Sequence, residues 1–241
     1  MRWIGLLVVV YCALGTPAPI EAGGADVRRE VRRSDFEVAS DAGIVLAVRE
    51  VVSPDAAPVG PPVILIHGAR VPGVASFDLD APHGSLAADL AAAGLHVFIM
   101  DARGYGGSTR TGQEGDPAGR PPLARSAEVV RDIAAVVKDV QRRTAAHQVA
   151  LLGWATGGHW AGMFASLHPD AISHLIMLNS LYGGQVGHPT LGPGGPLTDP
   201  ADPSRLDSSK VGAFGFSTAA SLVPSWDASI PLADKAAWRD P

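Results

Sequence analysis

Four short apolar runs, separated by helix-like segments, constrain the fold of this chain more than any other feature of its sequence. The runs span residues 63–66, 96–100, 148–152 and 174–178. A continuous apolar run of this length fits a strand that is buried on both faces of a sheet. Between them, residues 85–93 and 157–167 have helical patterns, and residues 126–140 carry apolar side chains at helical spacing. This alternation predicts parallel strands joined by right-handed helical crossovers.

An antiparallel hairpin is predicted before these elements. Two β-rich runs, 35–39 and 44–52, are separated by Ser40-Asp41-Ala42-Gly43, a favourable hairpin turn. The chain has 241 residues, 46% of them apolar, which is enough for one domain. The predicted fold class is therefore α/β, with a mostly parallel sheet, flanking helices and an N-terminal antiparallel hairpin.

The first 22 residues have the pattern of a cleaved signal peptide. Arg2 precedes an apolar run over 4–14, and Ile20 and Ala22 occupy the −3 and −1 positions before a cleavage site. We therefore expect an exported protein, periplasmic or secreted. The apolar run is too short to cross a bilayer, so no stable membrane span is expected once this leader is removed.

Composition excludes several classes of partner. The one cysteine, Cys12, lies inside the leader, so the mature chain is expected to lack disulfides and cysteine-bound metals. Net charge is −5, and the dense basic cluster lies in residues 23–34, which we expect to be a flexible terminal segment. This distribution argues against a nucleic-acid partner.

Three motifs follow successive apolar runs. His67-Gly68 follows the first run, residues 101–108 (Asp-Ala-Arg-Gly-Tyr-Gly-Gly-Ser) follow the second, and residues 153–158 (Gly-Trp-Ala-Thr-Gly-Gly) join the third to a helix. In this order they resemble the HG pair, D-x-R-G-x-G-x-S loop and G-x-Nuc-x-G elbow of the α/β-hydrolase superfamily. The resemblance covers residues 35–182. It implies structural, loop-bracing or close-packing roles for Asp101, Arg103, Gly104, Gly106, Ser108, Gly153 and Gly157.

The resemblance places Ala155 where the family has its nucleophile, at the apex of a strained turn between strand and helix. A methyl group has no proton to lose and no lone pair, so Ala155 cannot act as a nucleophile. A register using Thr156 would put Trp154 where a small residue is needed. The oxyanion hole would use backbone N–H groups of Ala69 and Thr156, which do not depend on side chains.

Other residues near the predicted elbow give no complete catalytic set. Asn179 follows the fourth run, where some relatives carry the catalytic acid, and an amide cannot replace that acid. The resemblance implies that His67 is a structural part of the HG turn. His159 is also interpreted as structural, although it lies close enough to the pocket to contact a ligand. The spacing of the histidines predicts no metal site, and no cofactor is expected because residues 104–107 lack the setting of a dinucleotide site. The predicted pocket contains His67, Gly68, Arg70, Trp154, His159 and Asn179.

Residues 183–241 are interpreted as a cap or lid-like segment. The resemblance implies two further strands, with the catalytic acid and histidine, beyond this segment, so we expect a truncated chain. The run 174–178 would then be an exposed apolar sheet edge, through which the chain could form oligomers.

Three functional interpretations remain open at this point. The first is a hydrolase-related protein that acts on a small carbonyl or ester substrate by a non-standard or weakened mechanism, without a serine nucleophile. The second is a non-catalytic pseudoenzyme that binds a small-molecule ligand. The third is a truncated, inactive fragment. None of the three interpretations allows turnover at the rate of an ordinary serine hydrolase, because loss of a catalytic triad lowers the rate about 10⁶-fold.

Overall fold

The computed structural model describes residues 30–55, 57–79, 84–110, 112–113, 115–120, 122, 124–180, 192–216, 218 and 220–221. The predicted leader, residues 23–29 and much of the predicted cap segment lie outside these residues. Within the described ranges, no helix is both long and apolar enough to cross a membrane.

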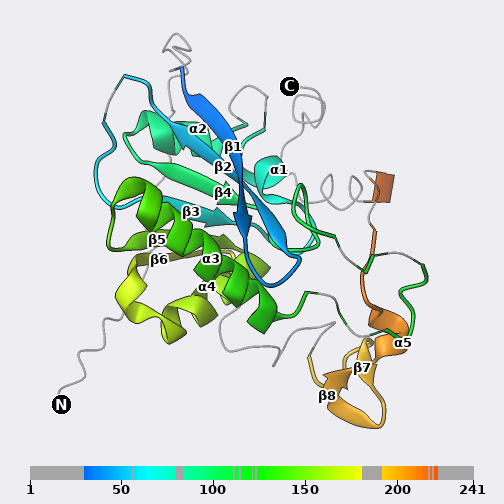
Figure 1. Cartoon of the computed structure of the whole chain (residues 1–241). Coiled ribbons are helices and arrows are strands. Elements are labelled where there is room, and N and C mark those ends of the chain that lie inside the picture. Colours follow the sequence, from blue (N-terminus) through cyan, green and yellow to red (C-terminus); the bar gives the residue numbers. More distant parts are fainter. Residues whose placement is uncertain are drawn as a thin grey trace, which may run out of the picture.

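The central sheet has the mostly parallel architecture that the sequence predicts. Its strands are β1 (Arg32–Ala39), β2 (Val45–Val52), β3 (Val63–Ile66), β4 (Val97–Met100), β5 (Val149–Trp154) and β6 (Ile172–Leu178). They form a six-stranded sheet in the order β1-β2-β4-β3-β5-β6 (Figure 1). β4, β3, β5 and β6 are parallel neighbours, whereas β1 pairs with β2, and β2 with β4, in antiparallel register. The predicted fold class is thereby confirmed.

The β1–β2 hairpin turns where the sequence predicts. The Ser40 N–H donates to the Ile44 carbonyl oxygen at 2.9 Å, and Gly43 has φ +77°, a conformation that favours glycine. Strand β1, however, begins at Arg32, so the prediction of a flexible segment over residues 23–34 was wrong for residues 32–34. Arg33 donates hydrogen bonds of 2.8–3.1 Å to the buried carboxylate of Asp78, a long-range contact that a local pattern cannot reveal.

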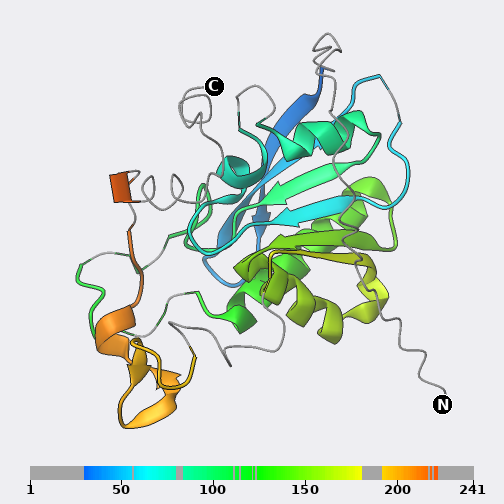
Figure 2. The same ribbon diagram turned by 180° about the vertical axis from the view of Figure 1, so that it is seen from behind.

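Helices cover both faces of the sheet. They are α1 (Gly73–Phe77), α2 (Leu86–Ala92), α3 (Ser126–Thr144) and α4 (Thr156–Leu167), with a 3₁₀ turn at Pro169–Ala171. α3 and α4 lie on the face seen in Figure 1, and α1 and α2 lie on the opposite face, which Figure 2 shows. α3 presents an apolar stripe to the sheet, as the spacing of its valines and Ile133 predicts.

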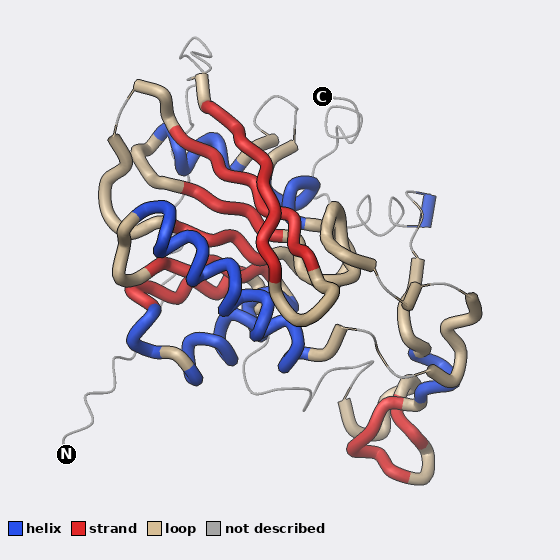
Figure 3. Tube along the Cα trace, viewed as in Figure 1, coloured by secondary structure: helices blue, strands red, loops and turns tan. Residues whose placement is uncertain are grey.

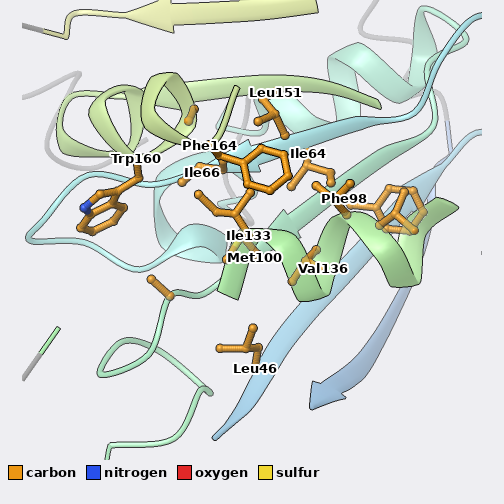
Figure 4. Packing of buried hydrophobic residues seen from close by; sticks show 14 of the residues in the cluster. Leu46, Ile64, Ile66, Phe98, Met100, Ile133, Val136, Leu151, Trp160 and Phe164 are labelled. Atoms are coloured by element: carbon orange, nitrogen blue, oxygen red, sulfur yellow. The ribbon is translucent and has the colours of Figure 1, made fainter. Parts of the chain in front are cut away.

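The larger core lies between the sheet and the α3–α4 layer. Figure 4 shows Ile133 of α3 and Phe164 of α4 among side chains from β3 and β4, all of them buried. β3 and β4 are buried along their whole length, as their continuous apolar runs predict. β6 differs, because in the described sheet it pairs only with β5 and is the edge strand. Leu175 is 40% exposed and Leu178 is 49% exposed.

A small subdomain lies to one side of the sheet. It contains β7 (Thr198–Asp199), β8 (Asp202–Leu206) and α5 (Ser208–Val211). Figure 3 shows this strand pair and short helix separated from the main sheet. The chain then returns toward the loops after β3 and β4, where Ala213 is buried.

Candidate functional site

Ala155 occupies the apex of the turn between β5 and α4. Its backbone has φ 52° and ψ −116°, and a conformation of this kind costs a residue with a side chain about 1–3 kcal/mol. Three hydrogen bonds hold the turn. The Ala155 N–H donates to the Leu178 oxygen at 2.9 Å, and the Ala155 oxygen accepts from the Ser180 hydroxyl at 2.7 Å and the Gly158 N–H at 3.1 Å. Thr156, by contrast, is already the first residue of α4.

Glycines are required around this turn because backbone segments approach each other closely. A Cβ on Gly153 would lie 2.4 Å from the Gly157 oxygen, and a Cβ on Gly157 would lie 2.2 Å from the Ile66 oxygen. On Gly68, a Cβ would be 3.3 Å from the Ala155 Cβ, so the loop after β3 packs directly beside the apex. Backbone atoms therefore pack closely on both sides of the elbow.

Two backbone N–H groups remain available beside the apex. In the described part of the chain, neither the Ala69 N–H nor the Thr156 N–H donates a hydrogen bond to another protein atom. The Thr156 N–H belongs to the first turn of α4, where the helix dipole favours negative charge. Both groups can polarise a ligand carbonyl oxygen if they converge on it.

His67 orients one of these donors. The Ala102 N–H donates to His67 Nε2 at 3.1 Å, so Nε2 is an acceptor and the proton lies on Nδ1. Nδ1 in turn donates to the Gly68 oxygen at 2.6 Å, and this carbonyl belongs to the same peptide group as the Ala69 N–H. Burial lowers the pKa of His67, which keeps the ring neutral. With both ring nitrogens engaged, His67 is a positioning residue and not a general base.

Asp101 braces the loop that follows β4. Its carboxylate accepts hydrogen bonds from the N–H groups of Gly73 at 2.6 Å and Gly107 at 2.9 Å. A Cβ on Gly106 would overlap this carboxylate, and the Ser108 hydroxyl donates to the Asp101 carbonyl oxygen at 2.6 Å. These contacts engage both oxygens of the carboxylate in holding the loop.

Arg103 ties the same loop to α3 and to the β1–β2 turn. Its guanidinium donates to Asp132 at 2.6 and 2.9 Å and to Asp41 at 2.8 Å. Asp132 is fully buried, so its charge needs this partner. Hydrogen bonds from Arg131 and Arg103 lower the pKa of Asp41 to about 2. Next to Arg103, Gly104 has φ +85°, which favours glycine.

The other residues of the predicted pocket lie around the elbow at different depths. Trp154 ends β5, half-buried, with Cε3 3.7 Å from the position of a Cβ on Gly68. His159 is half-buried in the first turns of α4, and Arg70 is exposed beside Ala69. Asn179 is exposed after β6, with a φ of +49° that asparagine tolerates. Among the described residues, no three histidine or acidic side chains are grouped so as to hold a metal ion.

A cavity lies beside Ala69, and of the six residues of the predicted pocket Arg70 alone is in its described lining. It has a volume of about 580 Å³, and its wall includes Ala69, Arg70, Tyr105, Arg110 and Phe214. The Tyr105 hydroxyl donates to the Ala69 oxygen at 2.7 Å, and its ring lies 4.7 Å from the His67 ring. Burial raises the pKa of Tyr105, which keeps the donating proton in place. Tyr105, an aromatic residue inside the D-x-R-G-x-G loop, was the sequence feature that could have indicated this cavity.

This fold and elbow define an α/β-hydrolase. The family model for the alpha/beta hydrolase fold matches residues 61–216, more than half of the chain. The chain therefore belongs to this family, and the resemblance stated from its three motifs is confirmed.

The chain is also similar to several solved structures of enzymes. The thioesterase domain from the curacin biosynthetic pathway is 22% identical, with a TM-score of 0.47, and the match covers 62% of this chain and 47% of that one. A thermophilic esterase from Thermogutta terrifontis is 20% identical, with a TM-score of 0.45 and coverage of 61% and 46%. Epoxide hydrolase A from Mycobacterium thermoresistibile is 24% identical, with a TM-score of 0.42 and coverage of 59% and 37%. This chain thus spans less than half the length of each.

Proposed function

We propose that this protein binds small carbonyl compounds at its elbow and forms no covalent acyl intermediate there. The observation that carries the proposal is a methyl group at the apex of an intact, strained elbow, beside two unengaged N–H groups. Because residues 1–22 have the pattern of a cleaved leader, the ligand would be met in the periplasm or outside the cell.

The chemistry available to such a site is polarisation of a carbonyl group. An ester oxygen that accepts from Ala69 and Thr156 becomes more electrophilic at carbon, but attack must then come from water. In a serine protease that has lost its triad, binding and the oxyanion hole still leave about 10³–10⁴-fold acceleration over water. Any hydrolysis by this protein is therefore weak, and binding is its principal activity.

Restoring a serine at the apex is expected to change turnover of short acyl esters by less than about tenfold. A serine hydroxyl needs a neighbouring base to become a useful nucleophile, and His67 has both ring nitrogens engaged. The measurement is the initial rate of p-nitrophenyl acetate hydrolysis by the native protein and by Ala155→Ser. Ala155→Gly is the matched control, since it changes the apex without adding a hydroxyl.

A gain of several orders of magnitude in Ala155→Ser alone would contradict the proposal. It would show that a working base and acid face the elbow, and that the protein is a hydrolase lacking only its nucleophile.

A further inference from the structure

The cavity beside the elbow has an unusual charge lining. It lies between the loop after β3, the loop after β4 and residues 213–216. The lining within the described chain includes Arg70, Arg103 and Arg110 and no aspartate or glutamate. The whole protein carries a net charge of −5, so this concentration of arginine is local.

Two of these arginines carry charge that no described carboxylate balances. The Arg103 guanidinium is neutralised by Asp132 and Asp41. Arg110 donates to the Gly106 carbonyl oxygen, a neutral group, and keeps its remaining N–H groups. Among the ion pairs formed by described residues, none involves Arg70 or Arg110. Within the described chain, the cavity therefore offers a ligand two guanidinium groups, those of Arg70 and Arg110, that no carboxylate pairs with.

Aromatic side chains supply the apolar part of the same cavity. Phe214 and Phe216 contact each other edge to face, with ring centroids 5.3 Å apart. Phe216 is 80% exposed, an uncommon position for a phenylalanine. Together with Tyr105, these rings can cover the carbon skeleton of a ligand whose polar group lies at the arginines.

The cavity includes one of the two proposed oxyanion donors in its wall. Ala69 lines the cavity, and its N–H is one of the two proposed donors to a ligand carbonyl. Tyr105 also lines the cavity, and its hydroxyl donates to the Ala69 carbonyl oxygen. This oxygen belongs to the peptide group between Ala69 and Arg70, so a ligand in the cavity lies beside that peptide group. A ligand in the cavity therefore lies beside both Arg70 and the peptide group that carries the Ala69 N–H.

We infer that the cavity takes the anionic end of the ligand, so that the carbonyl compound bound at the elbow also carries a carboxylate or phosphate group. Guanidinium groups bind both anions through paired, charge-assisted hydrogen bonds. The inference rests on the proposed function for the carbonyl end and on the cavity for the anionic end.

Calorimetric titration of the full chain tests this inference with three probes. Monomethyl succinate and acetyl phosphate carry both a carbonyl and an anion, whereas dimethyl succinate is neutral. Binding of either anion is expected to be at least about tenfold tighter than binding of the diester, the effect of a charge-assisted hydrogen bond. Of the two anions, the one that binds more tightly identifies the anionic group.

Variants test whether the preference for an anion arises from the arginines of the cavity. Arg70→Gln is expected to reduce the preference for the anion over the neutral diester to within about threefold. The matched control is Arg142→Gln, an exposed arginine on α3 whose partner is Asp139. It removes the same charge outside the cavity and is expected to leave the preference intact.

The outcomes separate this inference from the proposed function. Equal affinity for the diester and both anions, or a preference that survives both Arg70→Gln and Arg110→Gln, overturns the anionic site. The amide resonances of Ala69 and Thr156, followed by NMR in parallel titrations with the same probes, report on the carbonyl end. If anions bind through Arg70 without shifting those resonances, the cavity site stands and the proposed function is wrong.

Discussion

Replacing Gly157 with alanine is expected to lower the free energy of unfolding by more than about 3 kcal/mol, enough to prevent folding of a marginal domain. The added Cβ would lie 2.2 Å from the Ile66 oxygen and 2.5 Å from the His67 oxygen. Both are backbone atoms at the end of β3, in the centre of the sheet, and neither can move aside as a side chain would. Relief of the overlap must therefore displace α4 from the sheet.

Gly162 is the matched control, because it lies in the same helix. A Cβ there would contact only Met177, at 3.8 and 3.9 Å, which is ordinary packing. Gly162→Ala is expected to raise the free energy of unfolding by up to about 1 kcal/mol, through the better helix propensity of alanine. Urea unfolding followed by circular dichroism compares the two variants. Equal stability would mean that α4 does not approach β3 as closely as described.

Removing the buried carboxylate of Asp132 is the second change with a large expected effect. Asp132→Ala is expected to cost about 3–5 kcal/mol, since it leaves the Arg103 guanidinium buried without its main partner. The same carboxylate also accepts from the Ser40 hydroxyl at 2.7 Å, so the β1–β2 turn loses an anchor as well. The measurement is the midpoint and slope of urea unfolding, relative to the native protein.

Asp139→Ala provides the comparison for this prediction. Asp139 lies on the same helix and pairs with Arg142 and Arg143, which are exposed. Surface pairs of this kind contribute about 1 kcal/mol or less, so the variant is expected to remain close to the native protein. A similarly small effect in Asp132→Ala would show that Arg103 finds another partner or reaches solvent.

The parts of the fold that the sequence predicts are those with a local signature. Residues 63–66 form a strand buried on both faces because four consecutive apolar side chains leave no face for solvent. α3 follows from the helical spacing of its valines. The hairpin turn follows from Ser40 to Gly43, where the turn residues and the need for a positive φ coincide.

Elements that depend on distant contacts were not predictable in this way. α1 has only five residues and no apolar period, and Gly73 at its start is held by the carboxylate of Asp101. β1 begins at Arg32 because Arg33 pairs with Asp78, far along the chain. β7 and β8 are short and rich in Asp, Pro and Ser, residues that normally predict turns.

The candidate site, too, has features that the sequence predicts and features that it does not. The spacing of Gly153 and Gly157 around Ala155 predicts the elbow, because close backbone approach demands glycine on both sides. The orientation of the oxyanion donor by His67, and the cavity that Ala69 and Tyr105 line, arise where loops from different strands meet. Contacts between loops from different strands leave no signature in any single stretch of sequence.

The absence of a nucleophile at the elbow is tested most directly by the intact mass of the protein after incubation with a fluorophosphonate probe. An active serine hydrolase in the same reaction shows that the probe is reactive. The mass of this protein is expected to stay unchanged, because the apex carries only the methyl group of Ala155. A stoichiometric adduct that peptide mapping places at Thr156 would contradict this, since the residue after the apex would then be the nucleophile.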